Sequence, residues 1–208
     1  MTVVTSKMSR RSRKKEAIRS QIIAAAIELF SQHGISGVTV DQIAEAADVG
    51  KGTIYNYFQT KEDIVVAFMA AFEGKVQAKL RDVGTSQSPL AEVLTEFIRL
   101  QLRMKKRYHP FVRVFLGQMF LHTDQFLPHM AKIQKTMDPQ LQELLRDLQQ
   151  RGAIRPDINV SDLIVVFKTV QLGLTALWAI EGPPFTATER TLVQEIRLLC
   201  EGLEVKQR

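Results

Sequence analysis

The stretch that decides the fold is VDQIAEAADVGKGTIYNYFQTK, residues 40–61. Its first part predicts a short helix, because Thr39 can serve as the N-cap and Gln42, three residues later, completes a capping box. Residues 48–50 (DVG) interrupt the apolar period, and a second short helix is expected over roughly residues 51–58. Two short helices joined by a tight turn predict a helix-turn-helix.

The outward face of the second helix is rich in hydrogen-bonding groups. It carries Lys51, Thr53, Asn56 and Tyr57, with Tyr55 at its flank, and no acidic residue. Solvated helix faces usually carry Glu/Lys pairs, whereas amides, hydroxyls and phenols suit base edges and phosphates. The alternative is a surface helix with two half-buried tyrosines.

The longer run from Ile18 to Glu62 resembles the DNA-binding domain of the TetR/AcrR family of transcriptional regulators. The positions that carry the resemblance follow an apolar first helix and its terminal Gly34; they are Thr39-Val40, Ile43-Ala44, Lys51-Gly52-Thr53-Ile54-Tyr55, Tyr57-Phe58 and Lys61-Glu62. Two positions depart from the family's usual pattern, Asp48 in place of Gly and Gly50 in place of Ser. Asp tolerates a left-handed backbone and Gly is an acceptable N-cap, so we expect the same turn geometry.

The resemblance implies an all-α fold of about nine helices, in which a three-helix DNA-binding domain precedes a larger ligand-binding and dimerisation domain. We expect a flexible basic arm at residues 1–12, the helix-turn-helix domain at residues 13–60 and the regulatory domain at residues 61–208. The first helix is expected to run from about residue 13 to residue 33, and Thr60 should cap the helix that starts the regulatory domain.

The DNA contacts expected from the chemistry and the resemblance lie in the arm and around the second short helix. Thr39, Tyr55 and Lys61 are expected on phosphates, and Thr53 and Asn56, with Lys51, near base edges; an Asn amide matches N6 and N7 of adenine. The arm could equally be a solvated tail. The full set of predicted DNA-binding residues is Arg10, Arg11, Arg13, Thr39, Lys51, Gly52, Thr53, Tyr55, Asn56, Tyr57 and Lys61.

The C-terminal part of the chain predicts a dimer. Residues 161–181 are apolar almost all round, and a last helix follows, opened by an expected capping box of Thr186 and Glu189. Two such helices imply a partner, most economically a second copy across a two-fold axis. Asp162, Lys168 and Gln171 argue against a lipid span. The expected interface residues are Leu163, Val170, Leu174, Leu192, Ile196, Leu199 and Leu203.

The resemblance also implies a small-molecule inducer pocket between the regulatory helices. Each apolar candidate for its lining would serve equally well as ordinary core. We further expect a kink or break at Asp138-Pro139, within the helical stretch of residues 125–151. The candidate pocket residues are Phe68, Phe97, Gln101, Met104, Phe115, Met119, Phe167, Gln171 and Trp178.

The composition fits a basic cytoplasmic protein. The 28 Lys and Arg residues against 22 Asp and Glu give a net charge of +6, which suits a polyanionic partner but is spread over both halves of the chain. The single cysteine, Cys200, excludes an internal disulfide and fits a reducing compartment. Residues 1–15 lack the apolar segment of a secretory signal, and no apolar run reaches the ~18 residues of a membrane span.

We expect no enzymatic activity, no cofactor and no metal. No nucleophile elbow, phosphate-binding loop or dinucleotide fingerprint occurs in the sequence. The near-constellation of His122, Asp124 and His129 lacks the i, i+4 histidine pair of helical zinc sites. The predicted function is a homodimeric repressor that binds a palindromic operator in double-stranded DNA and is released by a small apolar or amphipathic effector. The alternatives are an architectural DNA-binding protein without sequence preference and a ligand-binding helical module whose DNA recognition has decayed.

Overall fold

The computed structural model describes residues 9–83, 89–121 and 141–203. This part of the chain is all-α, as predicted. It includes a short 3-10 turn, η1 (Lys106–Tyr108), and a helical segment at residues 141–150. The expected break at Asp138-Pro139 lies outside the described residues. The remaining helices are α1 (Arg10–His33), α2 (Val40–Ala46), α3 (Lys51–Tyr55), α4 (Lys61–Val83), α5 (Leu90–Lys105), α6 (His109–Leu121), α8 (Val160–Glu181) and α9 (Thr186–Leu203).

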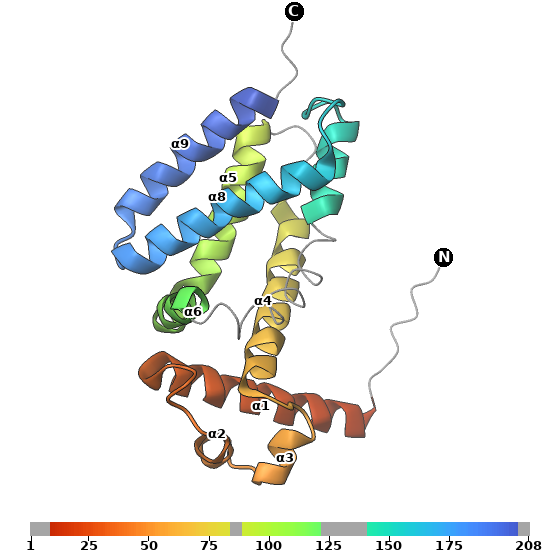
Figure 1. Cartoon of the computed structure of the whole chain (residues 1–208). Helices are drawn as coiled ribbons and strands as arrows, with labels where there is room; N and C mark the ends of the chain where they lie inside the picture. The colour runs from red at the N-terminus through yellow and green to blue at the C-terminus, as the bar shows by residue number, and fades with distance from the viewer. Residues whose placement is uncertain (1–8, 84–88, 122–140, 204–208) are drawn as a thin grey trace, which may run out of the picture.

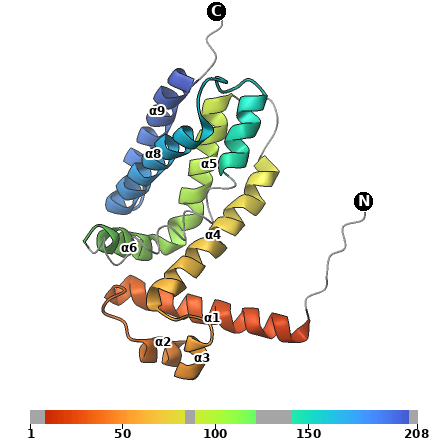
Figure 2. The ribbon, with the colours of Figure 1, turned by 45° about the vertical axis from the view of Figure 1, so that its right-hand side comes forward.

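The helices form two connected groups (Figure 1). Helices α2 and α3 lie on one side of α1, and α4 runs from α1 towards the group made by α5, α6, α8 and α9. Within that second group α9 packs on α5 and α8, and α6 packs on α8. Figure 2 shows α6 lying close above α1, and these two helices are in contact. The two groups are therefore joined through α4 and also through the α1–α6 contact.

The local signals around α2 are confirmed. The Thr39 hydroxyl accepts a hydrogen bond from the Gln42 N–H at 3.2 Å, and the Gln42 amide oxygen accepts from the Thr39 N–H at 2.8 Å, which completes the capping box. Asp48 has φ 48°, the left-handed backbone expected of the turn. Gly50 is the N-cap of α3 and makes no side-chain cap. The turn between the two short helices has the geometry inferred from its sequence.

The first helix begins three residues earlier than predicted. Ser9 is its N-cap and accepts a hydrogen bond from the Ser12 N–H at 3.1 Å. Arg10 and Arg11 therefore lie on the first turn of α1 and are not part of a flexible arm. Ser9 directly precedes this run of basic residues, and its role as an N-cap was not predicted.

The expected capping box at α9 is wrong. Thr186 is already the first helical residue, and the Glu181 carboxylate at the end of α8 accepts hydrogen bonds from the N–H groups of Ala187 at 2.7 Å and Thr188 at 2.8 Å. Glu189 instead pairs with Arg99 of α5. A carboxylate supplied by the preceding helix thus accepts from two of the first N–H groups of α9, and the Glu189 N–H, which the box would have bonded to Thr186, donates to the Phe185 carbonyl at 3.1 Å.

The residues predicted for the dimer interface lie on the wrong face of α8 and α9. Five of them are at most 7% exposed in the core of a single chain, and a partner could not reach them: Leu163, Leu174, Leu192, Ile196 and Leu203. Val170 and Leu199 are half-buried against the same core. Helix α8 is long and apolar enough to cross a membrane, as many core helices are, and one face of it is buried in the core of the described residues.

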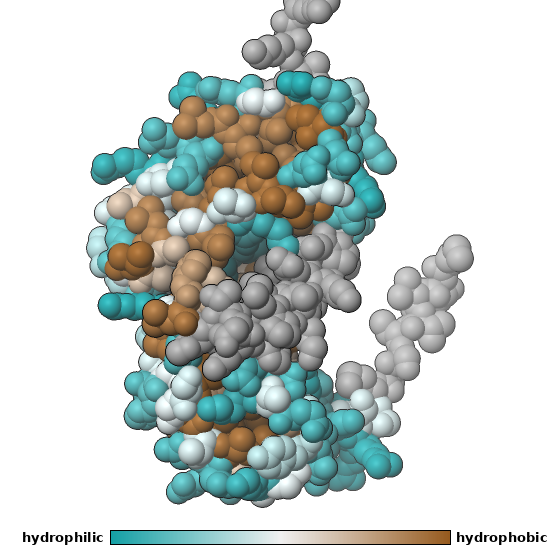
Figure 3. All heavy atoms as spheres, in the orientation of Figure 1, coloured by the Kyte–Doolittle hydropathy of each residue, from teal (hydrophilic) through white to brown (hydrophobic). Residues whose placement is uncertain are grey.

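Large apolar residues remain exposed on the opposite face. Figure 3 shows an extended hydrophobic surface over α8 and α9. We call this surface the α8–α9 patch. Its exposed apolar residues are Val165, Val166, Leu172 and Ile180 of α8 with Val193 and Leu198 of α9.

Candidate DNA-binding surface and interdomain groove

Helix α3 is anchored on one side and open on the other. Ile54 and Phe58 are 1% and 5% exposed, and they fix the helix and the turn after it in the core below α1. Lys51, Tyr55 and Asn56 are exposed, and Asn56 is the C-cap of the helix. The structure therefore brings the predicted base-contacting residues together on one accessible surface.

Three further predicted residues belong to this surface. Thr53 and Tyr57 are half-buried at its edge. Gly52 is exposed, and a Cβ added there would meet no atom of the described residues within 4 Å. Packing within the described part of the chain does not require a glycine at this position. Its absence of a side chain leaves room for another molecule to approach the backbone closely.

The Lys51 ammonium is held by α2. Its Nζ donates to the Asp41 carboxylate at 2.9 Å, and this hydrogen bond, with the charge of Asp41, raises the pKa of Lys51. Both side chains are more than half exposed, so the pair orients the lysine more than it stabilises the fold. Lys51 would have to leave Asp41 to contact a base or a phosphate.

Lys61 has a structural role that its sequence position did not reveal. Its Nζ donates to the carbonyl oxygens of Ile35 and Val38, each at 2.7 Å, and it thereby ties the start of α4 to the α1–α2 loop. Two of the three ammonium protons are used within the chain. Lys61 as a phosphate contact stays a prediction and rests on its third proton and on the N-terminus of α4. Thr39 is exposed, and its hydroxyl likewise already accepts a hydrogen bond within the chain, from the Gln42 N–H of the capping box.

The same loop is held from the other side by α6. The side-chain amide oxygen of Gln118, on α6, accepts a hydrogen bond from the Ile35 N–H at 3.1 Å. Gly34 ends α1 with φ 74°, and a Cβ there would lie 3.0 Å from the Gln118 amide nitrogen. Glycine is therefore required at this position by both the backbone and the close approach of Gln118. The partners are 83 residues apart, which is why the sequence gave no signal for this contact.

The basic residues predicted to contact DNA outside the helix-turn-helix lie on the first turns of α1. Arg10, Arg11 and Arg13 are all exposed. As part of a helix they form a fixed basic surface.

Most of the predicted pocket residues belong to the core. Phe97, Phe115, Phe167 and Trp178 are at most 5% exposed. Phe97 packs on Phe167 with ring centroids 5.7 Å apart, and Met119 is half-buried against the same core. Gln101 and Gln171 are also buried, and their side-chain amides hydrogen-bond to each other between α5 and α8. The sequence could not show whether these residues line a cavity or fill the core, because aromatic rings at helical spacing occur in both.

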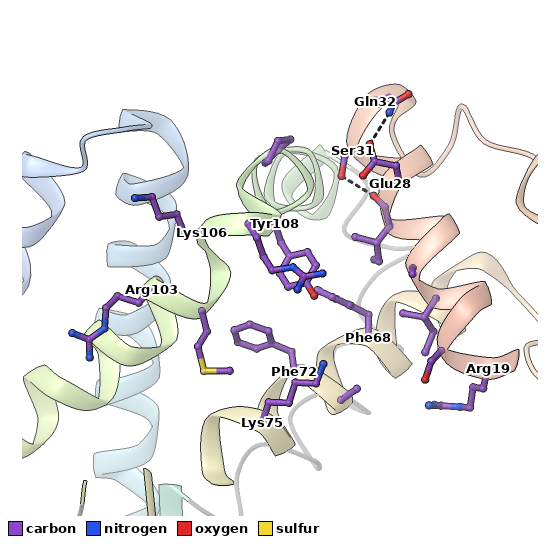
Figure 4. A pocket seen from close by; sticks show the side chains of 18 of the residues that line it. Arg19, Glu28, Ser31, Gln32, Phe68, Phe72, Lys75, Arg103, Lys106 and Tyr108 are labelled. Atoms are coloured by element: carbon purple, nitrogen blue, oxygen red, sulfur yellow. Dashed lines mark hydrogen bonds between the residues drawn. The ribbon is translucent and has the colours of Figure 1, made fainter. Parts of the chain in front are cut away.

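The remaining two predicted pocket residues, Phe68 and Met104, line a groove at a different place. It has a volume of about 1210 Å³ and lies between α1, α4 and the α5–η1 segment (Figure 4). We call it the interdomain groove, because α1 and α5 belong to the two different groups of helices. Its other principal lining residues are Arg19, Ile23 and Ile27 of α1, Phe72 and Lys75 of α4, and Leu100, Arg103, Lys106, Arg107 and Tyr108 of α5 and η1.

The described residues contain no group of three His, Cys, Asp or Glu side chains that could hold a metal ion. The near-constellation of His122, Asp124 and His129 lies outside them.

Two family models match the chain. One describes the C-terminal domain of SbtR-like transcriptional regulators and covers residues 89–204, more than half of the chain; the other, for bacterial regulatory proteins of the tetR family, covers residues 22–68. The chain belongs to the TetR family. The resemblance inferred from the sequence is therefore confirmed, and the chain is a DNA-binding transcriptional regulator.

Curated relatives are transcriptional regulators, not enzymes. The regulator RutR of Escherichia coli (strain K12) is 29% identical over 147 residues, which cover 71% of this chain and 69% of RutR. The repressor KstR2 of Mycobacterium tuberculosis (strain H37Rv) is 24% identical over 174 residues, which cover 82% of this chain and 86% of KstR2.

Solved structures share the fold. FadR from Bacillus halodurans, a fatty acid degradation regulator, matches with a TM-score of 0.70 at 22% identity, covering 94% of this chain and 96% of FadR. The Thermus thermophilus FadR repressor, solved in complex with lauroyl-CoA, matches with a TM-score of 0.69 at 23% identity, covering 91% and 97%.

Proposed function

We propose that this protein is a homodimeric, cytoplasmic repressor that reads a palindromic operator and is released from it by a small molecule. The observation that carries the proposal is that one chain exposes two surfaces, the polar face of α3 and the apolar α8–α9 patch. A monomer would leave the patch in water, whereas a two-fold dimer would bury it and present two copies of α3.

The patch suits an isologous contact. Val165 and Ile180 are 65% and 78% exposed, although each belongs to a helix whose other face is core. Four helices, α8 and α9 from each chain, would meet with their apolar faces together. Two α3 helices in successive major grooves lie about 34–36 Å apart, so the operator should be a palindrome with half-sites one turn apart.

The effector is the third part of the proposal. A repressor must lose its operator when a signal appears, and a ligand can do this only by binding one arrangement of the two α3 helices better than another. Relatives of this fold include a repressor solved with lauroyl-CoA, which supports a regulatory domain of this architecture as a ligand-binding unit. We propose no catalytic role for any residue.

The test is selection of bound DNA from a random pool at physiological salt. Recovery of a palindromic motif by the wild-type protein is the expected result. Leu172→Glu places a charge in the α8–α9 patch without touching the core, since Leu172 is 42% exposed, and it should weaken binding to the full palindrome. Tight, salt-sensitive binding without a motif would refute sequence reading and favour an architectural protein. Absence of DNA binding by ligand-free protein, stripped by denaturation and refolding, would favour a ligand-binding module with decayed DNA recognition.

A further inference from the structure

The interdomain groove joins a cationic rim to an aromatic wall. Five cationic side chains line it against two acidic ones; they are Arg19, Lys75, Arg103, Lys106 and Arg107 against Glu16 and Glu28. Glu28 accepts a hydrogen bond from Gln32, and Glu16 lies 3.7 Å from Arg19. The net charge of the lining is therefore positive.

Three of these cations, Lys75, Lys106 and Arg107, make no ion pair with any residue that the structure describes. Arg107 instead lies over the ring of Tyr108, with its guanidinium carbon 4.6 Å from the ring centroid. Figure 4 shows Lys75 of α4 and Arg19 of α1 pointing into the space between these two helices, whereas Arg103 and Lys106 point away from Tyr108. Unpaired ammonium and guanidinium groups beside a cavity attract an anion.

The aromatic wall consists of Phe68, Phe72 and Tyr108. The edge of one ring meets the face of another between Phe68 and Tyr108, at 4.8 Å and 78°, and the Phe72 and Tyr108 centroids are 6.4 Å apart. Met104 lies beside them as a flexible apolar side chain. The Tyr108 hydroxyl has no hydrogen-bond partner among the described residues and is free to donate to a ligand. A wall of this kind binds an apolar body, and its hydroxyl and the nearby cations suit an anionic head.

We propose that the interdomain groove binds an amphipathic anion, an apolar body with a carboxylate or phosphate head, and that this ligand controls the operator affinity of the proposed repressor. The apolar body lies against Phe68, Phe72 and Tyr108, and the head lies near Lys75 and Arg107. The proposal rests on the proposed function for its effect on DNA, but not for binding itself.

The groove is placed to couple ligand and DNA because its walls belong to different groups of helices. Ile23 and Ile27 line it from α1, and Tyr108 lines it from η1 at the start of the regulatory helix α6. A ligand that touches both walls binds best at one separation between them. By linkage it then favours that separation, and DNA that favours another separation lowers the affinity of the ligand by the same factor.

The experiment uses three probes with the same alkyl chain and different heads: dodecanoate below its micellar concentration, 1-dodecanol, and dodecyltrimethylammonium. Binding is measured by calorimetry and by the melting temperature of the full chain, and operator affinity is measured with and without each probe. We expect dodecanoate to bind, to raise the melting temperature and to change operator affinity by about 5- to 150-fold. The alcohol and the cation should bind more weakly and leave operator affinity close to its probe-free value.

The variant is Lys75→Glu combined with Arg107→Glu, and the matched control is Arg146→Glu, an exposed cation remote from the groove lining. The double variant should fold and bind dodecanoate at least about tenfold more weakly. Each substitution replaces a cation that attracts the carboxylate with an anion that repels it, and each should lower the affinity a few-fold. Arg146→Glu should behave as wild type.

The proposal is overturned if dodecanoate and dodecanol bind equally well, if dodecanoate does not bind, or if the double variant responds as wild type, which would place the ligand elsewhere. Failure of the proposed function gives a different pattern: no operator is bound under any condition, while calorimetry still reports whether dodecanoate binding depends on Lys75 and Arg107. Dodecanoate that binds in the groove without altering operator affinity overturns the regulatory half of the proposal.

Discussion

Lys61 provides the sharpest test, because its expected phosphate contact and its observed structural role predict different results. In the structure its ammonium donates to two loop carbonyls at 2.7 Å, and Lys61→Met removes both hydrogen bonds while keeping the length of the stem. A hydrogen bond with a charged partner contributes about 1.5–3 kcal/mol, and the half-buried site lets water replace part of this. We therefore expect the unfolding free energy to fall by about 2–4 kcal/mol, which corresponds to a melting temperature lower by about 4–16 °C.

The assay combines urea unfolding with operator binding over a series of salt concentrations. A lost phosphate contact lowers the slope of log K against log salt by about 0.9, so a symmetric dimer would lose about 1.8. We expect a large loss of stability and a slope change well below that value. Lys106→Met, at an exposed lysine without an ion pair among the described residues, should change stability by less than about 0.5 kcal/mol. Unchanged stability of Lys61→Met together with a slope lower by about 1.8 would refute the structural role.

Three further outcomes are expected. Asn56→Ala should cost about 1–3 kcal/mol at one base position of the operator and leave the preference elsewhere intact, as measured by competition with single-base variants; an equal loss on all sequences would contradict base reading. Leu172→Glu should convert the proposed dimer to a folded monomer in sedimentation, with helical circular dichroism retained, and a dimer of unchanged affinity would place the interface elsewhere. Burial opposes ionisation of Glu96, but hydrogen bonds and charge from Arg99 and Arg103 outweigh it and hold its pKa below the ordinary 4.5. The stability it contributes is present above pH 4.5 and lost as the pH falls through the lowered pKa, so wild type and Glu96→Gln should converge in urea unfolding at acid pH; a constant difference would contradict this.

The parts of the molecule that the sequence predicted are those fixed by near neighbours. The Thr39–Gln42 capping box joins residues three apart, and the left-handed backbone at Asp48 follows from the steric tolerance of one residue. The α3 surface was predicted for the same reason, because Ile54 and Phe58 are one helical turn apart and direct the polar residues outward.

The parts that the sequence did not predict depend on distant neighbours. Helix α8 is apolar nearly all round, so its own pattern cannot say whether Leu174 or Leu172 faces the core; the packing of α5, α6 and α9 decides it. Glu181 satisfies the α9 donors from another helix, and no spacing within α9 reveals it. The Gln118 contact likewise joins segments that only the fold brings together.

The α1–α2 loop explains how such distant contacts reach the DNA-binding surface. One residue, Ile35, links both sides: its N–H donates to the Gln118 side chain of α6, and its carbonyl accepts a hydrogen bond from Lys61 at the start of α4. Lys61 also holds the Val38 carbonyl, directly before the N-cap of α2. A shift between α6 and α4 must therefore move this loop or break a hydrogen bond, and α2 and α3 follow the loop. The groove lies between α1, α4 and the η1 turn that precedes α6, so an occupant there acts on the same elements that hold the loop. Helix α6 contacts the loop through Gln118 near one end and adjoins the groove at its other end, and α4 lines the groove and holds the loop through Lys61. Ligand binding would therefore change the position of α3 through α6 and α4.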